Sequence, residues 1–228
     1  MSDLVHNLSM NAGGFSPVVE FNGQRDKLLA LDFTSANKEL THEVLNDIEK
    51  FSKYIDDRLA AAGALYGIGG YGEHRTIYGL SSLFDNEEPG AEPRRLHLGV
   101  DIWGEVGTRV HAPLGASVHS FAYNDRRGDY GATIILSHEL DGITFHTLYG
   151  HLDLDSINRI SVGDRIEKGQ VFAAFGPPKE NGYWPPHLHF QLIADMDGYR
   201  GDYPGVCKFS ERRIWLERCP DPGLILRW

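Results

Sequence analysis

The chain has 228 residues, of which 41% are hydrophobic and 24% are charged, a composition typical of a globular protein with a sizeable core. Its 22 lysines and arginines are outnumbered by 32 aspartates and glutamates, so the net charge is -10. This balance argues against a nucleic-acid or anionic-membrane partner, because both require a basic surface.

No targeting or membrane-spanning segment is visible in the sequence. Residues 1–7 contain no basic cluster, and no apolar signal-peptide core follows them. No run approaches the ~20 apolar residues that cross a bilayer. We therefore expect a cytoplasmic protein, or a cell-envelope protein if this chain is a mature or trimmed form. Cys207 and Cys219 lack C-x-x-C spacing, and free thiols are favoured over a disulfide.

Residues 1–93 are expected to form an arm followed by a helical segment. Residues 1–35 mix Asn, Gly, Ser and Pro with short apolar runs, which predicts an arm lying over a core. Apolar residues at 3.6-residue spacing then predict an amphipathic helix from Thr34 or Ser35 to residue 62, ending at Gly63 or soon after. This helix is interpreted as a packing helix, with partner binding as the alternative.

The glycine-rich stretch at residues 66–72 does not have the pattern of a nucleotide loop. No strand is predicted before it, no Gly-Lys-Ser/Thr ends it, and Glu73 would repel a phosphate. Residues 73–78 either line a groove leading to a site or form a solvated turn. Residues 85–93 are predicted to be a boundary loop.

From residue 94 to residue 197 the pattern changes to short strands separated by glycine, which indicates a mainly β domain. This succession of short strands separated by glycines favours an antiparallel β-sandwich or two-sheet fold. Residues 198–228 are expected to form a tail with a short helix near Trp215, stopped by Pro220. The predicted strands are residues 100–103, 108–112, 116–123, 132–138, 144–150, 165–166, 171–175 and 187–194.

His97-x-Gly99-x-Asp101 is the first of three motifs with metal-binding chemistry. In a straight strand the two potential ligands would stand roughly 13 Å apart, too far for one ion. Gly99 offers a bend that brings them together.

The other two motifs supply further imidazoles. His187-x-His189 lies in a predicted strand, whose period of two puts both rings on one side. His151 follows Gly150 at the end of another strand. The remaining candidates are interpreted as structural, including His138, the most tempting of them; they are His111, His119, His138 and His146.

Four histidines and one aspartate are sufficient for a catalytic zinc site. Such a site uses three protein ligands and leaves a fourth position open, with histidine and carboxylate as common ligands. Zinc lowers the pKa of water and polarises a carbonyl oxygen, while free imidazoles transfer protons. The reaction that fits this set of groups is amide hydrolysis.

In these motifs the sequence resembles the lysostaphin- and LytM-type zinc endopeptidases, over roughly residues 96–194. The resemblance implies a mostly antiparallel β groove that binds one zinc ion per chain. It implies that His97, Asp101 and His189 are the zinc ligands and that His151 and His187 are the catalytic histidines. The implied substrates are peptides or peptidoglycan fragments.

One departure from the family concerns a tyrosine that precedes the first histidine in some members and polarises the carbonyl. None stands there in this sequence, and Arg75, Tyr78 or Tyr130 is expected to substitute. Two alternatives to a peptidoglycan endopeptidase are a cytoplasmic hydrolase of a small peptide or amide metabolite and a non-catalytic metal-binding scaffold. The complete set of ligands and imidazoles argues against the scaffold.

Overall fold

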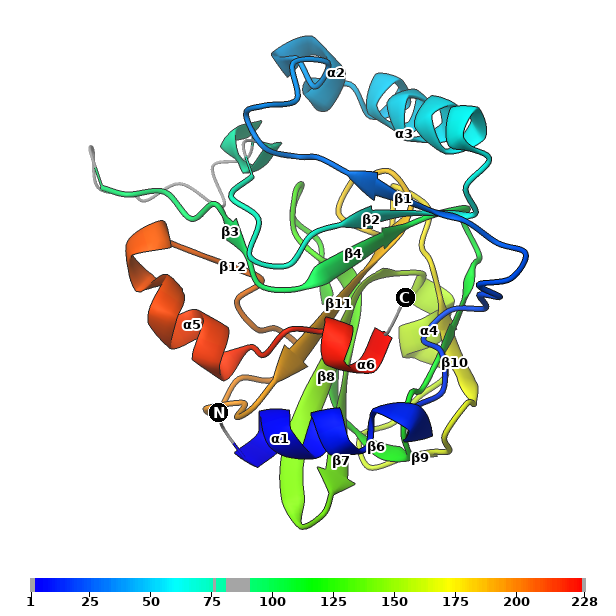
Figure 1. Ribbon diagram of the computed structural model, residues 1–228, viewed down its shortest axis with the longest axis vertical. Helices are drawn as coiled ribbons and strands as arrows, with labels where there is room; N and C mark the ends of the chain where they lie inside the picture. The colour runs from blue at the N-terminus through cyan, green and yellow to red at the C-terminus, as the bar shows by residue number, and fades with distance from the viewer. Residues whose placement is uncertain (1–2, 76, 81–90, 227–228) are drawn as a thin grey trace.

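The computed structural model describes residues 3–75, 77–80 and 91–226, and a twisted eight-stranded sheet runs through it (Figure 1). Neighbouring strands of this sheet are antiparallel except for the first two, which are parallel. In their spatial order they are β1 (Leu28–Leu31), β2 (Tyr66–Gly69), β4 (Val100–Trp103), β11 (His187–Ile193), β8 (Ile143–Leu152), β7 (Gly131–Leu140), β6 (Ala116–Asn124) and β9 (Arg165–Ile166).

Two small sheets and several short helices complete the fold. One small sheet pairs β5 (Arg109–His111) with β10 (Val171–Ala174), and the other pairs β3 (Leu96–His97) with β12 (Val206–Cys207). The mainly β, multi-sheet architecture predicted from the sequence is confirmed. The helices are α1 (Asp3–Met10), α2 (His42–Asn46), α3 (Ile48–Ala62), α4 (Leu154–Asn158), α5 (Arg212–Arg218) and α6 (Gly223–Leu226), with 3-10 turns at Ala12–Gly14, Ile77–Leu80 and Phe209–Glu211.

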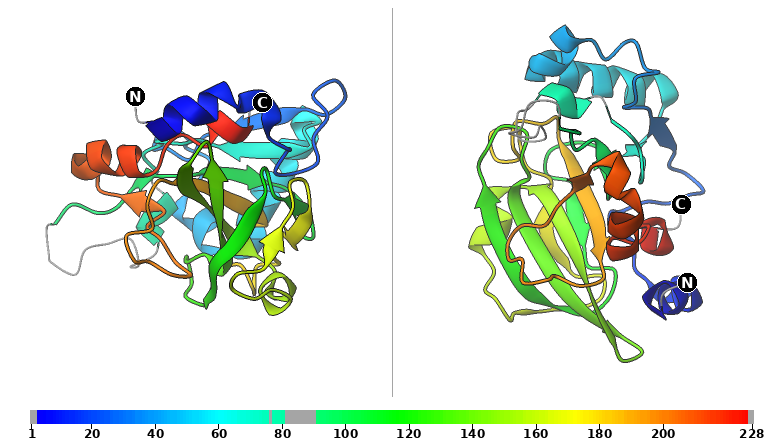
Figure 2. Two further views of the ribbon diagram at one scale, coloured as in Figure 1. Left: turned by 90° about the horizontal axis from the view of Figure 1, so that it is seen from below. Right: turned by 90° about the vertical axis from the view of Figure 1, so that its left-hand side faces the viewer.

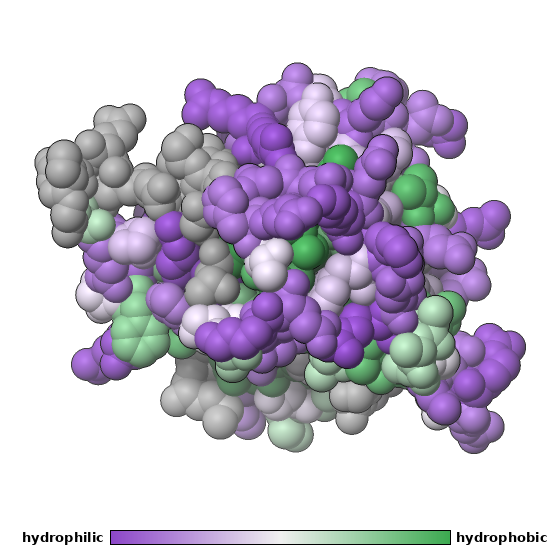
Figure 3. Space-filling model, turned by 90° about the horizontal axis from the view of Figure 1, so that it is seen from above, coloured by the Kyte–Doolittle hydropathy of each residue, from purple (hydrophilic) through white to green (hydrophobic). Residues whose placement is uncertain are grey.

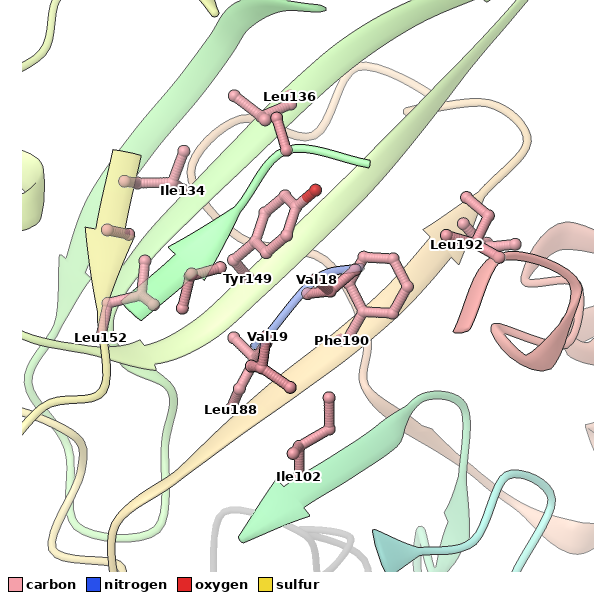
Figure 4. Close-up of a cluster of buried hydrophobic side chains, with 14 of the residues drawn as sticks. Val18, Val19, Ile102, Ile134, Leu136, Tyr149, Leu152, Leu188, Phe190 and Leu192 are labelled. Atoms are coloured by element: carbon pink, nitrogen blue, oxygen red, sulfur yellow. The ribbon is translucent and has the colours of Figure 1, made fainter. Parts of the chain in front are cut away.

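The main hydrophobic core lies on one face of the large sheet, because side chains alternate along each strand. Ile102 of β4 and Leu188 and Phe190 of β11 point into this core, where they meet Tyr149 of β8 (Figure 4). The opposite face of the same two strands carries Asp101, His187 and His189, while His97 comes from β3 and His151 from the end of β8. A single alternation therefore separates the core from the candidate site.

The arm at the start of the chain contributes to the core as well as covering it. Leu8, Val18 and Val19 are almost completely buried in the main cluster. Helix α1 packs beside α6, so the two ends of the chain lie close together (Figure 2). The arm continues into β1, an unpredicted strand that extends the large sheet through β2.

The predicted helix over residues 34–62 is two helices, and its predicted start was wrong. Helix α2 begins after Thr41, whose hydroxyl accepts the Val44 N–H at 3.3 Å. Asp47 then interrupts the helix, because its carboxylate accepts two backbone N–H groups and caps α3. Helix α3 ends at Gly63, as predicted, and packs its apolar side against Trp103 and its neighbours.

The strands predicted between residues 94 and 197 are confirmed, with ends that differ by no more than two residues. Strands β3 and β12 and helix α4 were not predicted. The predicted tail helix is α5, which ends two residues before Pro220. The predicted boundary loop, residues 85–93, lies mostly outside the described residues.

The surface on the side of α2 and α3 is mostly hydrophilic (Figure 3). Within the described part of the chain, no helix combines the length and the apolar character needed to cross a bilayer.

Candidate metal centre and active site

Three motif residues meet on the polar face of the large sheet. Asp101 on β4 stands directly opposite His189 on the neighbouring strand β11. His97 reaches the same point from β3, on the other side of the bend at Gly99. Asp101 Oδ1 lies 3.0 Å from His189 Nδ1 and 3.3 Å from His97 Nε2, and the two nitrogens are 3.0 Å apart.

Gly99 has two roles, of which the sequence predicted one. The chain bends there, and the bend brings His97 to Asp101 as expected. Its φ is not in the left-handed region, so the backbone conformation alone does not require glycine. A Cβ at this position would lie 2.6 Å from His189 Cε1 and 2.8 Å from the Phe190 carbonyl oxygen. Glycine is therefore needed to make room for the imidazole of His189.

Hydrogen bonds on the outer side of each imidazole determine its tautomer. His97 Nδ1–H donates to the Gly70 carbonyl oxygen at 2.9 Å. His189 Nε2–H donates to Gln191 Oε1 at 2.8 Å, and the orientation of that amide is set by its NH₂ group, which donates to the Pro204 carbonyl oxygen at 3.1 Å. The inward atoms, His97 Nε2 and His189 Nδ1, are consequently lone-pair acceptors.

These two nitrogens and a carboxylate oxygen form a set of three acceptors with no proton between them. Such an arrangement is repulsive unless a cation sits among them. All ligand atoms lie within 4.8 Å of one another, and no other group of three His, Cys, Asp or Glu side chains among the described residues converges in this way. Two imidazoles and one carboxylate are a donor set that suits zinc and leave a fourth position open.

The ionisation states are also those that a metal requires. Burial lowers the pKa of His97 to about 4, assisted by the positive charge of Arg75. Burial acts to raise the pKa of Asp101, but the interaction with His97 and the positive charge of Arg75 outweigh it and hold the pKa well below the usual range. Near neutral pH the site thus offers a neutral imidazole and an ionised carboxylate.

His151 and His187 lie next to this cluster, with ring centroids 4.1 Å apart. Each donates its Nδ1–H to a backbone carbonyl at 2.8 Å, the acceptor being Asn181 for His151 and Pro185 for His187. Each Nε2 is then an unprotonated acceptor. Burial lowers the pKa of both rings, that of His187 to about 4. His187 also stacks on Trp103 at 3.9 Å.

The backbone of His151 has a φ of 63°, a conformation that residues other than glycine rarely adopt. Its N–H donates to the Tyr130 carbonyl oxygen at 2.7 Å, and its carbonyl accepts the Gly176 N–H at 2.9 Å. Strain of this kind persists only where surrounding contacts enforce it, and it concentrates at functional sites.

A cavity of about 280 Å³ opens onto these residues, and the three expected substitutes for the missing tyrosine all line it. Tyr78 accepts a hydrogen bond from Arg75 Nη1 at 3.1 Å, so those two side chains are occupied with each other. The Tyr130 hydroxyl is buried with no hydrogen-bond partner among the described residues. Its ring centroid lies 5.7 Å from that of His151 and 5.1 Å from that of His189.

The other histidines considered in the sequence do not line this cavity. His138 is buried, with Nε2 2.7 Å from Thr147 Oγ1 and Nδ1 3.2 Å from the Gly115 carbonyl oxygen. Its ring stacks on Phe145. This environment is that of a structural histidine.

Two residues that shape the site were not assigned to it from the sequence, and a third makes a contact that was not expected. Gln191 continues the alternation of His187 and His189, so period two was enough to place it on the same face. The Asn181 carbonyl accepts from His151, and Arg75, expected only as a substitute for the tyrosine, contacts Asp101. Both lie in irregular segments, where no periodicity predicts a contact.

Comparison with known proteins identifies the domain that carries this site. Residues 95–200 match the family model described as Peptidase family M23. This stretch is thus similar to the M23 peptidases and is called the M23 domain below. It is 30% identical over 141 residues to the L-Ala--D-Glu endopeptidase of Bacillus subtilis (strain 168), and the match covers 57% of this chain and 41% of that protein.

Solved structures resemble the M23 domain more distantly. The catalytic domain of lysostaphin from Staphylococcus simulans matches with a TM-score of 0.39 and 21% identity, over 72% of this chain and 96% of that one. A zinc-containing peptidase from Vibrio cholerae matches with a TM-score of 0.36 and 23% identity, over 48% of this chain and 30% of that one. All five predicted site residues lie within the M23 domain.

Proposed function

We propose that the chain is a zinc-dependent metallopeptidase that hydrolyses peptide or amide bonds of peptidoglycan or peptidoglycan-derived peptides. The observation that supports this most strongly is the convergence of three unprotonated donor atoms beside two further imidazoles in one cavity. The substrate class is supported by the family and by a relative named for endopeptidase action on an L-Ala–D-Glu sequence.

In this proposal His97 Nε2, Asp101 Oδ1 and His189 Nδ1 hold one zinc ion. Zinc in a three-ligand site acts as a Lewis acid, which lowers the pKa of water to about 7 and polarises a carbonyl oxygen. The outer hydrogen bonds of His97 and His189 keep both rings turned inward, as is usual for histidine ligands.

His151 and His187 are assigned the proton transfers. Both carry a proton on Nδ1 and expose Nε2, so either ring is able to take a proton from the attacking water and pass it to the leaving nitrogen. The Tyr130 hydroxyl is a donor without an acceptor among the described residues, and we assign it to the negative charge that develops on the carbonyl oxygen.

The test is turnover by the zinc-loaded protein on a panel of substrates analysed by mass spectrometry. Peptidoglycan fragments containing D-amino acids are compared with all-L peptides and with small amides. We expect cleavage of the peptidoglycan fragments and no cleavage by His151→Ala. Cleavage of small amides alone would favour a metabolite hydrolase, and zinc binding without turnover of any substrate would favour a scaffold.

A further inference from the structure

Arg75 lies outside the part of the chain that matches the M23 family, yet it contacts a residue of the metal centre. Its side chain is 1% exposed, and its Nη1 group donates to Asp101 Oδ2. Nε donates to Glu73 Oε2 at 2.7 Å, and the guanidinium lies 5.1 Å above the Phe33 ring. These contacts hold Nε and Nη1 in place, while Nη2 is buried without a hydrogen-bond partner among the described residues.

We propose that Arg75 is a positioning residue that presents Asp101 to the metal through a single oxygen. This inference rests on the zinc centre proposed above and adds a contribution from the region before the M23 domain. The carboxylate of an aspartate rotates over a broad range about its last torsion. Because Arg75 holds Oδ2, the other oxygen, Oδ1, faces His97 and His189.

Glu73 makes this arrangement electrostatically compatible with a cation. An arginine alone beside a metal ligand would repel the ion, but the ion pair of Arg75 with Glu73 is neutral overall. The second oxygen of Glu73 accepts the Phe33 N–H at 3.1 Å. A continuous set of contacts therefore runs from the end of β1 to Asp101, with the negative charge of Asp101 left for the ion.

The glycine-rich stretch provides the space that Arg75 occupies. A Cβ on Gly69 would lie 2.5 Å from Arg75 Nη2, closer than van der Waals contact allows. A Cβ on Gly115, which lies outside the site, would meet no atom within 4 Å. Neither glycine has a positive φ, so the two alanine variants differ in the contacts of the added methyl group, which at Gly69 also include Phe33 Cε2 at 3.2 Å and Trp103 Nε1 at 3.3 Å.

The experiment measures zinc affinity of the full chain by competition with a chelator, and the absorption spectrum of the cobalt-substituted protein. Arg75→Met removes the charge and the hydrogen bonds, and Arg75→Lys keeps only the charge. Gly69→Ala displaces the guanidinium while leaving Arg75 in the chain, and Gly115→Ala is its control. Folding of each variant is checked by thermal unfolding.

We expect Arg75→Met and Gly69→Ala to bind zinc about 10–100-fold more weakly, with shifted cobalt bands, and Arg75→Lys to recover part of the loss. Gly115→Ala should match the wild type. A purely structural role would lower the unfolding temperature without changing the affinity of the folded protein. Wild-type zinc affinity in folded Arg75→Met would overturn the inference. If Arg75→Met does not fold, wild-type zinc affinity in both Arg75→Lys and Gly69→Ala would overturn it.

Failure of the wild-type chain to bind zinc would instead remove the metal centre itself, and with it both proposals. Zinc binding by the wild type that is unaffected by Arg75 and Gly69 substitutions would remove only the positioning role.

Discussion

Gly99→Ala is the substitution whose effect on the proposed metal centre follows most directly from the geometry. The new Cβ would lie 2.6 Å from His189 Cε1 and 2.7 Å from its Nε2. To reach ordinary contact, which begins at 3.4 Å, the ring must move by about 0.8 Å. Metal–ligand distances tolerate only about 0.2 Å. The alanine and a correctly placed His189 are therefore incompatible without a shift of the strand.

The strand itself resists such a shift. Phe190, whose carbonyl oxygen would be 2.8 Å from the new Cβ, pairs with β4 on one side and β8 on the other. The clash with the His189 ring opposes the ring position that the proposed metal site requires, and the clash with the Phe190 carbonyl oxygen acts on the fold with or without metal. Overpacking of this kind costs about 1–3 kcal/mol, which corresponds to roughly 5–150-fold in affinity.

The assay is zinc affinity by chelator competition, with Gly115→Ala as the control. A Cβ added at Gly115 would have no atom within 4 Å, and this glycine has no positive φ, so alanine is expected to be harmless there. We expect Gly99→Ala to weaken zinc binding by about one to two orders of magnitude while the protein stays folded. Equal zinc affinity in the two variants would refute the steric explanation of the motif glycine.

Three further predictions concern single side chains. Tyr130→Phe should leave zinc affinity unchanged and lower kcat about 100-fold or more, measured on the cleaved peptide; an unchanged kcat would remove the hydroxyl from the mechanism. Burial lowers the pKa of His138 to about 4. The neutral, buried imidazole therefore stabilises the fold above about pH 6.5, and this stabilisation is lost as the pH falls to about 4. Over that range the wild type should lose about 3 kcal/mol more than His138→Gln in urea unfolding, and parallel pH profiles would contradict this. Burial raises the pKa of the free Cys207 and Cys219 thiols to about 12, so their alkylation should be slow until the protein unfolds. Rapid labelling of the native protein would contradict this and show that the thiols are accessible.

Features of the fold with strong local periodicity were predictable from the sequence. Alternation in β11 placed His187 and His189 on one face, and the glycines between strands marked the turns, whereas the position of Asp101 beside them follows from the pairing of β4 with β11. The position of Gly63 at the end of α3 followed from the same kind of local rule.

Contacts that depend on tertiary packing were not predictable in this way. Asp47 looked like one more polar residue on a long helix, because a cap and an exposed helical aspartate have the same sequence pattern. Strand β1 is only four residues long and pairs in parallel with β2, from which α2 and α3 separate it in the sequence. The contact of Arg75 with Asp101 joins an irregular segment to a strand, and no periodicity encodes it.

The steric role of Gly99 shows the same limit at atomic scale. A bend was inferred from the glycine itself, but its close approach to His189 requires knowing that β11 lies beside β4.

The measurement that tests the central claim most directly is the zinc content of purified variants by elemental analysis. We expect close to one zinc per chain in the wild type, in His151→Ala and in His187→Ala. His97→Ala, Asp101→Ala and His189→Ala should each contain almost none, although all remain folded. Full zinc occupancy in Asp101→Ala would contradict the account.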